Sequence, residues 1–171
     1  MSDYDAWVEL TEIYTEMYQQ SDRAAALAGG SFLEDTLRDA IITRFVTLSQ
    51  TRKNALFKGT DAPLSKFSAK IEIGFALHLY GDLTRIDLDH IRKIRNFFAH
   101  SSRRVDFTVK RIVNHCMQLT TPGRIPIGGI APDPLGDCRS RYISTVCHLS
   151  SMLHTWRNPL RHILQHNWDL P

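Results

Sequence analysis

A ten-residue stretch at residues 91–100 combines side chains that could bind a phosphate group and transfer protons. Its sequence is Ile-Arg-Lys-Ile-Arg-Asn-Phe-Phe-Ala-His. Arginine binds phosphate oxygens through paired hydrogen bonds, and histidine titrates near neutral pH. In a helix, Asn96 and His100 lie one above the other, with Arg92 one turn earlier. Arg95 is about 140° around the helix from His100, but its side chain is long enough to swing back. The stretch therefore predicts a polar site along one edge of a helix.

The apolar residues of the same stretch are spaced for burial, and its surroundings are basic. Ile91, Ile94 and Phe98 recur at helical intervals and predict a stripe that faces a core. Asp106 is the one acid among seven neighbouring cations, which are Arg92, Lys93, Arg95, Arg103, Arg104, Lys110 and Arg111. Such a patch can bind a phosphate backbone. The alternatives are a solvated face and a surface covered by the acidic N-terminal segment.

Length, charge and composition bound the class of protein. A chain of 171 residues with 43% hydrophobic and 23% charged residues is typical of one globular domain. The net charge of +3 conceals an asymmetry, because residues 1–40 carry nine acidic and two basic side chains. No apolar run reaches the roughly 18 residues of a membrane span, and the acidic N-terminus resembles no targeting peptide. Three scattered cysteines do not indicate a disulfide framework, so we expect a cytoplasmic protein.

Hydrophobic spacing and capping residues predict an all-α bundle of about five to seven helices. The expected helices cover residues 4–20, 22–49, 65–80, 84–100, 106–119 and 137–157, with a tail helix at 160–166. They form a single domain with a core at about 22–119 and C-terminal helices at 137–166. Residues 50–63 are expected to be a connection. Residues 120–136 hold four prolines and four glycines and predict an irregular loop, which is a lid, an interface or simply mobile.

Two local patterns carry further expectations. Glycine is a poor helix former, so the pair at 29–30 indicates either close approach of another helix or a helix break. Thr84 and Asp87 are spaced as in a capping box. Asp82, Asp87 and Asp89 are therefore interpreted as capping and solvent-facing acids and not as a catalytic pair.

Several blocks of the chain resemble the mannitol-operon repressor (MltR-like) family. In chain order they are DRAAAL at 22–27, SFLED at 31–35, LF at 56–57, PLSKFSAKI at 63–71 and IRKIRNFFAH at 91–100. Their order and spacing agree over about residues 22–107. The resemblance implies an all-helical protein of transcriptional regulation without a recognisable helix-turn-helix. It does not imply mannitol, because many proteins with this layout have no tie to that sugar.

A narrower pattern, RNFFAH, begins at Arg95 and resembles the Arg, polar residue, His signature of HEPN-type helical ribonucleases. Those enzymes commonly dimerise and bring two motifs together over RNA. The resemblance would assign Arg95 to the scissile phosphate, Asn96 to positioning and His100 to proton transfer. Alternatively, Arg95 pairs with an acid such as Glu34 or Asp35, and Asn96 and His100 tie down the helix end.

The leading interpretation is a regulator that acts through protein–protein contacts and forms a homodimer, with a regulator or an antitoxin as partner. The alternative is a metal-independent endoribonuclease with a composite site at a dimer interface. A third hypothesis is nucleic-acid binding through the basic patch at 92–111. We expect no cofactor, no membrane contact and no metal site. His162 and His166 share a predicted helix face, but no tight cysteine pair or His-Glu-x-x-His motif accompanies them.

Overall fold

Helices make up all the regular secondary structure in residues 3–124 and 137–155, the part of the chain that this computed structural model describes. The predicted all-α fold is therefore confirmed. None of these helices is long and apolar enough to cross a membrane. The predicted tail helix at 160–166, with His162 and His166, and most of the predicted loop at 120–136 lie outside the described residues.

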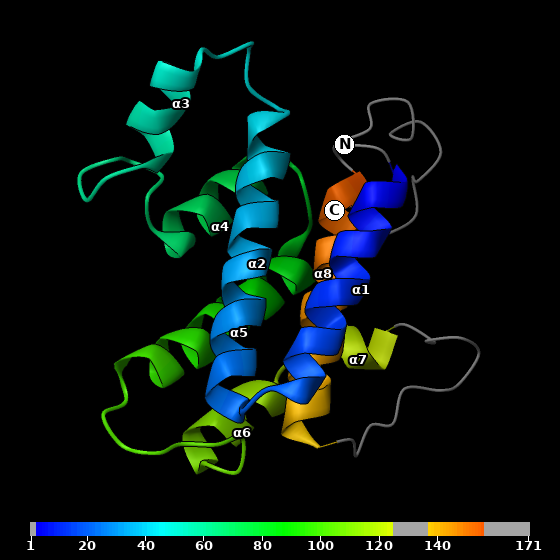
Figure 1. The fold of residues 1–171 in the computed structure, drawn as a ribbon. Helices are drawn as coiled ribbons and strands as arrows, with labels where there is room; N and C mark the ends of the chain where they lie inside the picture. The colour runs from blue at the N-terminus through cyan, green and yellow to red at the C-terminus, as the bar shows by residue number, and fades with distance from the viewer. Residues whose placement is uncertain (1–2, 125–136, 156–171) are drawn as a thin grey trace.

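The central helix of the bundle is α2, which packs against four others (Figure 1). The helices are α1 (Asp3–Gln19), α2 (Asp22–Ile42), α3 (Gln50–Phe57), α4 (Phe67–Ala76), α5 (Asp82–His100), α6 (Lys110–Met117), α7 (Thr121–Arg124) and α8 (Cys138–Thr155). Helices α1 and α8 lie side by side against α2, and α4 and α5 contact it as well. Helix α6 packs on α5 and α8. The acidic α1 thus packs chiefly on α2 and α8, whereas the basic patch belongs to α5, α6 and their connection.

The glycine pair in α2 marks the closest helix contacts. A Cβ atom on Gly29 would lie 2.5 Å from Sδ of Met17 in α1, and one on Gly30 would lie 2.7 Å from Cγ of Arg95 in α5. Helix α2 continues unbroken through both positions. Of the two expectations for this pair, close approach of neighbouring helices is confirmed, because only a residue without a side chain fits there.

The predicted helix over 22–49 is wrong at its C-terminal end, and so is the predicted connection at 50–63. Helix α2 ends at Ile42, and α3 begins after Ser49, whose side chain accepts a hydrogen bond from the N–H of Arg52 at 3.4 Å. In the sequence, Phe45 continues the apolar pattern of α2, which is why the predicted helix extends beyond Ile42. Phe45 packs instead against Phe57 of α3, with ring centroids 6.4 Å apart. The apolar face therefore continues in space although the helix stops.

Two other helices are shorter than predicted. Helix α4 ends at Ala76, because the chain turns at His78 and Tyr80 folds back to donate a hydrogen bond to the carbonyl of Ile71 at 2.8 Å. Helix α6 begins only at Lys110. The apolar spacing of this segment predicts that Met117, its last residue, faces inward, but Met117 is 53% exposed.

The expectation that Asp87 is a solvent-facing cap is also wrong. Asp87 is 0% exposed, and its carboxylate accepts hydrogen bonds from the backbone N–H and hydroxyl groups of Thr120 and Thr121 at 2.6 to 3.0 Å. It therefore caps α7, a helix at residues 121–124 where a loop was predicted, while Gly81 precedes α5. Proline at position 122 suits this first helical turn, where its missing N–H costs nothing.

Candidate functional site

The rotation of α5 about its axis is fixed by its apolar stripe. Ile91, Ile94 and Phe98 are each 0% exposed, as predicted. Burying large apolar side chains is worth about 1.5 to 3 kcal/mol each. Because this stripe faces the core, Arg92, Lys93 and Asn96 are presented along the edge of α5 that faces α6.

A hollow of about 450 Å³ lies between this edge of α5 and α6, and we call it the α5–α6 hollow. It is lined by Arg92, Lys93, Asn96, Phe97, His100, Ser101 and Arg111. The predicted alignment of Arg92, Asn96 and His100 on one face is therefore confirmed. Arg103, Arg104 and Lys110 are exposed but do not belong to this lining.

Two of the cations in the hollow share one carboxylate. Asp89 accepts hydrogen bonds from Nε and Nη2 of Arg92 at 3.0 and 2.6 Å, and Nζ of Lys93 lies 2.6 Å from its other oxygen. Partial burial would raise the pKa of the Asp89 carboxyl, but the hydrogen bonds and charges of Lys93 and Arg92 outweigh burial and lower that pKa. Asp89 is thus ionised at neutral pH and offsets one of the two positive charges.

The third cation of the hollow rests on an aromatic ring. The guanidinium carbon of Arg111 lies 5.5 Å from the centroid of the Phe97 ring, a cation–π contact between α6 and α5. This contact holds the guanidinium group of Arg111 at the hollow, beside the Phe97 ring.

Arg95 points into the bundle and is not part of the hollow's lining. Its Nη2 lies 3.0 Å from Oε2 of Glu34, and the other oxygen of Glu34 lies 2.5 Å from Nζ of Lys70. The Lys70 side chain is only 7% exposed and that of Glu34 13%. Glu34 is therefore the acid that pairs with Arg95, while Asp35 pairs with Arg38 at 2.7 Å. Lys70 was missed from the sequence, because an isolated lysine in a helical pattern predicts a solvated side chain.

The polar end of α5 is held mainly by residues other than His100. The hydroxyl of Ser101 donates to the carbonyl of Phe97 at 2.6 Å. The Arg23 guanidinium donates to the carbonyls of Ser101 and Arg103 and so satisfies free acceptors after the helix end. Asn96 accepts a hydrogen bond from Nη1 of Arg95 at 3.1 Å. His100 is exposed at the rim of the hollow.

A histidine pair that no sequence pattern indicated joins α5 to α6. The Nδ1 atoms of His90 and His115 lie 3.0 Å apart, and the ring centroids are 5.2 Å apart. Burial and the charge of Lys93 lower the pKa of His90, against smaller raising effects of Asp89 and Asp87. Burial, His90, Lys93 and Arg111 lower the pKa of His115, and Asp89 opposes them. Both rings are therefore kept neutral near pH 7, when one Nδ1–H can donate to the other Nδ1.

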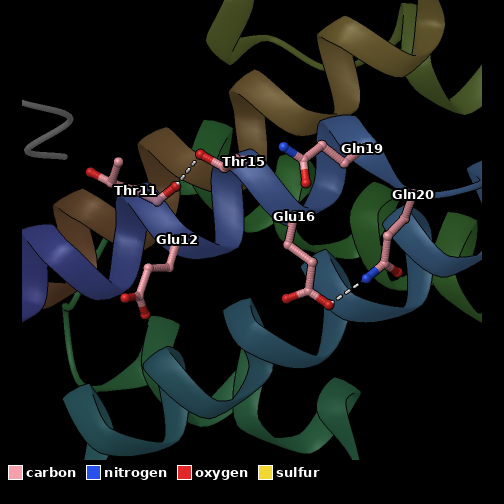
Figure 2. Close-up of a pocket in the computed structure, with 6 residues that line it drawn as sticks. All are labelled: Thr11, Glu12, Thr15, Glu16, Gln19 and Gln20. Carbon is pink, nitrogen blue, oxygen red and sulfur yellow. Dashed lines mark hydrogen bonds between the residues drawn. The ribbon is translucent and has the colours of Figure 1, made fainter.

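Two further hollows differ in character from the α5–α6 hollow. One of about 360 Å³ runs along α1 and is lined by uncharged polar and acidic side chains, with Gln20 hydrogen-bonded to Glu16 and Thr15 to the Thr11 carbonyl (Figure 2). The other, of about 550 Å³, lies between α2 and α3 and mixes acids and bases, including Glu34 and Lys70. Neither was predicted from the sequence.

Comparison with known proteins gives one informative likeness. The chain superposes on a chain of the X-ray structure of the MtlR–HPr complex from Escherichia coli with a TM-score of 0.64, over 84% of this chain and 97% of that chain. The two sequences are 14% identical, so the likeness shows a shared fold. It supports an MtlR-like fold and does not bear on the HEPN-like motif. No protein-family model matches the sequence, and no curated protein matches it.

Proposed function

We propose that this chain is a regulatory protein that acts by binding another protein, in the service of transcriptional regulation. The observation that carries the proposal is the MtlR-like fold, which in the Escherichia coli structure occurs in a complex with the protein HPr. We propose a protein of the HPr class as the partner. A cytoplasmic location and a homodimeric state belong to the same proposal.

The surroundings of Arg95 favour this function over catalysis. An arginine that binds a scissile phosphate must offer its guanidinium group to the substrate. Here one end of that group pairs with Glu34, and another nitrogen donates to Asn96. Since Glu34 also holds the buried Lys70, taking Arg95 away would leave a buried ionic group with an incomplete set of partners. These contacts support a structural role for the arginine.

Calorimetric titration of the chain with HPr from the organism that encodes this chain tests the proposal. We expect saturable binding with a dissociation constant in the micromolar range, which is common for regulatory contacts. Ubiquitin, a small protein of a different fold, serves as the control partner and should give no heat of binding. HPr at about 100 µM would saturate a site with a micromolar dissociation constant. If this concentration gives no more heat of binding than the control, the proposed partner is wrong.

The second candidate function is a metal-independent endoribonuclease, and the α5–α6 hollow is the observation that favours it. Asn96 and the exposed His100 line the hollow together with Arg92, Lys93 and Arg111. An RNA phosphate placed there would meet cations and a group able to transfer protons. The complete site would need a second copy of the chain, because each copy supplies a single histidine to this lining.

Expression in a bacterial host separates the two functions. An endoribonuclease should arrest growth, and His100→Ala should relieve the arrest without loss of folded protein. His78→Asn, at an exposed histidine that lies outside the lining of this hollow, is the matched control and should leave the arrest unchanged, because asparagine tolerates the positive φ of 53° there. Normal growth with the wild-type chain rejects the nuclease.

A further inference from the structure

We propose that the α5–α6 hollow is a binding site for a phosphate dianion, either free or carried by a small phosphorylated molecule. The site is built from side chains of α5 and α6 and stands independently of the proposed function. Three observations carry the proposal. They are the charge balance of the hollow, the orientation of one amide, and a cation–π contact on the aromatic ring of the hollow.

The charges at the hollow match a dianion. Arg92, Lys93 and Arg111 bring three positive charges there, and Asp89 is the carboxylate that contacts two of them. The set therefore has a net formal charge of two positive. Arg92 uses its Nε and one Nη2 hydrogen on Asp89. A guanidinium group has five N–H donors, so donors remain for an oxyanion.

The amide of Asn96 is oriented to donate. Its oxygen accepts the hydrogen bond from Nη1 of Arg95, so the amide nitrogen is the polar atom left for the hollow. Arg95 is itself fixed by Glu34, and Glu34 by the buried Lys70. Arg95 is thus a positioning residue, which acts on a ligand through Asn96 and not by direct contact.

The aromatic ring of the hollow favours a small ligand over a nucleic acid. Single-stranded nucleic acids gain much of their affinity when bases stack on exposed aromatic rings. Here the guanidinium group of Arg111 lies over the Phe97 ring. Arg111 also lines the hollow, so the pair offers a guanidinium group to a phosphate at the ring on which a base would otherwise stack. Arg23, which donates to the carbonyls of Ser101 and Arg103, offsets the negative end of α5 near the hollow.

Titration of ¹⁵N-labelled protein with sodium phosphate tests the site through the side-chain amide signal of Asn96. We expect a saturable shift of this signal with half-saturation at low millimolar phosphate. Asn96→Asp lacks this side-chain signal, so binding by this variant and by the wild type is compared through the backbone amide signals of Phe97 and Arg111. The variant should bind at least about tenfold more weakly, because a carboxylate replaces the donor. The fold should survive, since the new oxygen still accepts from Arg95. Asn54→Asp on α3 introduces the same charge at a residue of another hollow and should leave binding unchanged.

Phosphoserine and a ten-nucleotide single-stranded RNA distinguish the ligand classes. Phosphoserine should compete with free phosphate and shift the same Asn96 signal. The proposal is overturned if phosphate gives no saturable shift, or if Asn96→Asp binds as well as the wild type. RNA that binds the hollow and resists displacement by phosphate would also overturn it and assign the hollow to nucleic acid.

Discussion

Nη2 of Arg95 lies 3.0 Å from Oε2 of Glu34, so the arginine of the phosphate-binding pattern is paired within its own chain. This one contact links α5 to α2 across the region where Gly30 lets the two helices approach. The same contact also affects the α5–α6 hollow, because Arg95 donates a hydrogen bond to Asn96 and holds its amide at the edge of that hollow.

Glu34→Gln should destabilise the fold by about 2 to 3 kcal/mol, because it leaves the charge of the buried Lys70 poorly compensated. Urea unfolding followed by circular dichroism measures this. Asp35→Asn is the matched control on the same helix. Its side chain is 63% exposed and forms a surface pair, so the change should be within about 0.5 kcal/mol. Equal losses in the two variants would mean that the Glu34 pairs do not stabilise the bundle.

Gly30→Ala should cost about 1 to 3 kcal/mol, although alanine is the better helix former. The added Cβ would lie 2.8 Å from Cβ of Arg95, so the two helices must separate. Ser31→Ala, at the next and exposed position of α2, should be neutral or slightly stabilising. The melting temperatures of both variants check this prediction, and a Gly30→Ala variant as stable as wild type would contradict the close packing.

The stability of the chain should fall as the pH drops below about 6.5. His90 and His115 have lowered pKa values in the folded state, so the unfolded chain binds more protons below the ordinary histidine pKa. Their contribution is present above that pH and is lost at lower pH, when protons on both rings set two N–H groups against each other.

Urea unfolding between pH 7.5 and 5.5 measures this dependence. His115→Gln should have roughly half the slope of the wild type, because one of the two titrating groups is removed. His78→Asn should keep the wild-type slope. Asparagine tolerates the positive φ of 53° at this exposed position. Equal slopes for His115→Gln and wild type would show that the histidine pair does not cause the dependence.

The sequence was sufficient where the signal was local and periodic. Ile91, Ile94 and Phe98 were predicted as a buried stripe because their spacing alone fixes one helix face. The same periodicity extended α2 too far, since Phe45 continues the apolar pattern but packs on Phe57 after a turn. Helix periodicity does not distinguish a continuing helix from a second helix that returns to the same core.

Long-range partners lay beyond what the sequence could determine. Asp87 carries the signature of a helix start, yet its partners are 33 and 34 positions away at α7. Glu34 and Asp35 were equally good partners for Arg95 by sequence, and only the rotation of α2 decides between them. Arg111 was predicted as a member of the basic patch, but its contact with Phe97 was not, because that contact depends on how α6 packs on α5.

The central claim is that this chain works by binding a partner and does not cut RNA. It is tested most directly by the rate at which the purified chain cleaves a fluorescent single-stranded RNA in the presence of EDTA, measured beside His100→Ala. The account predicts equal rates for the two proteins, both at the level of buffer alone. Cleavage by the wild type that disappears in a folded His100→Ala variant would contradict it and establish the nuclease.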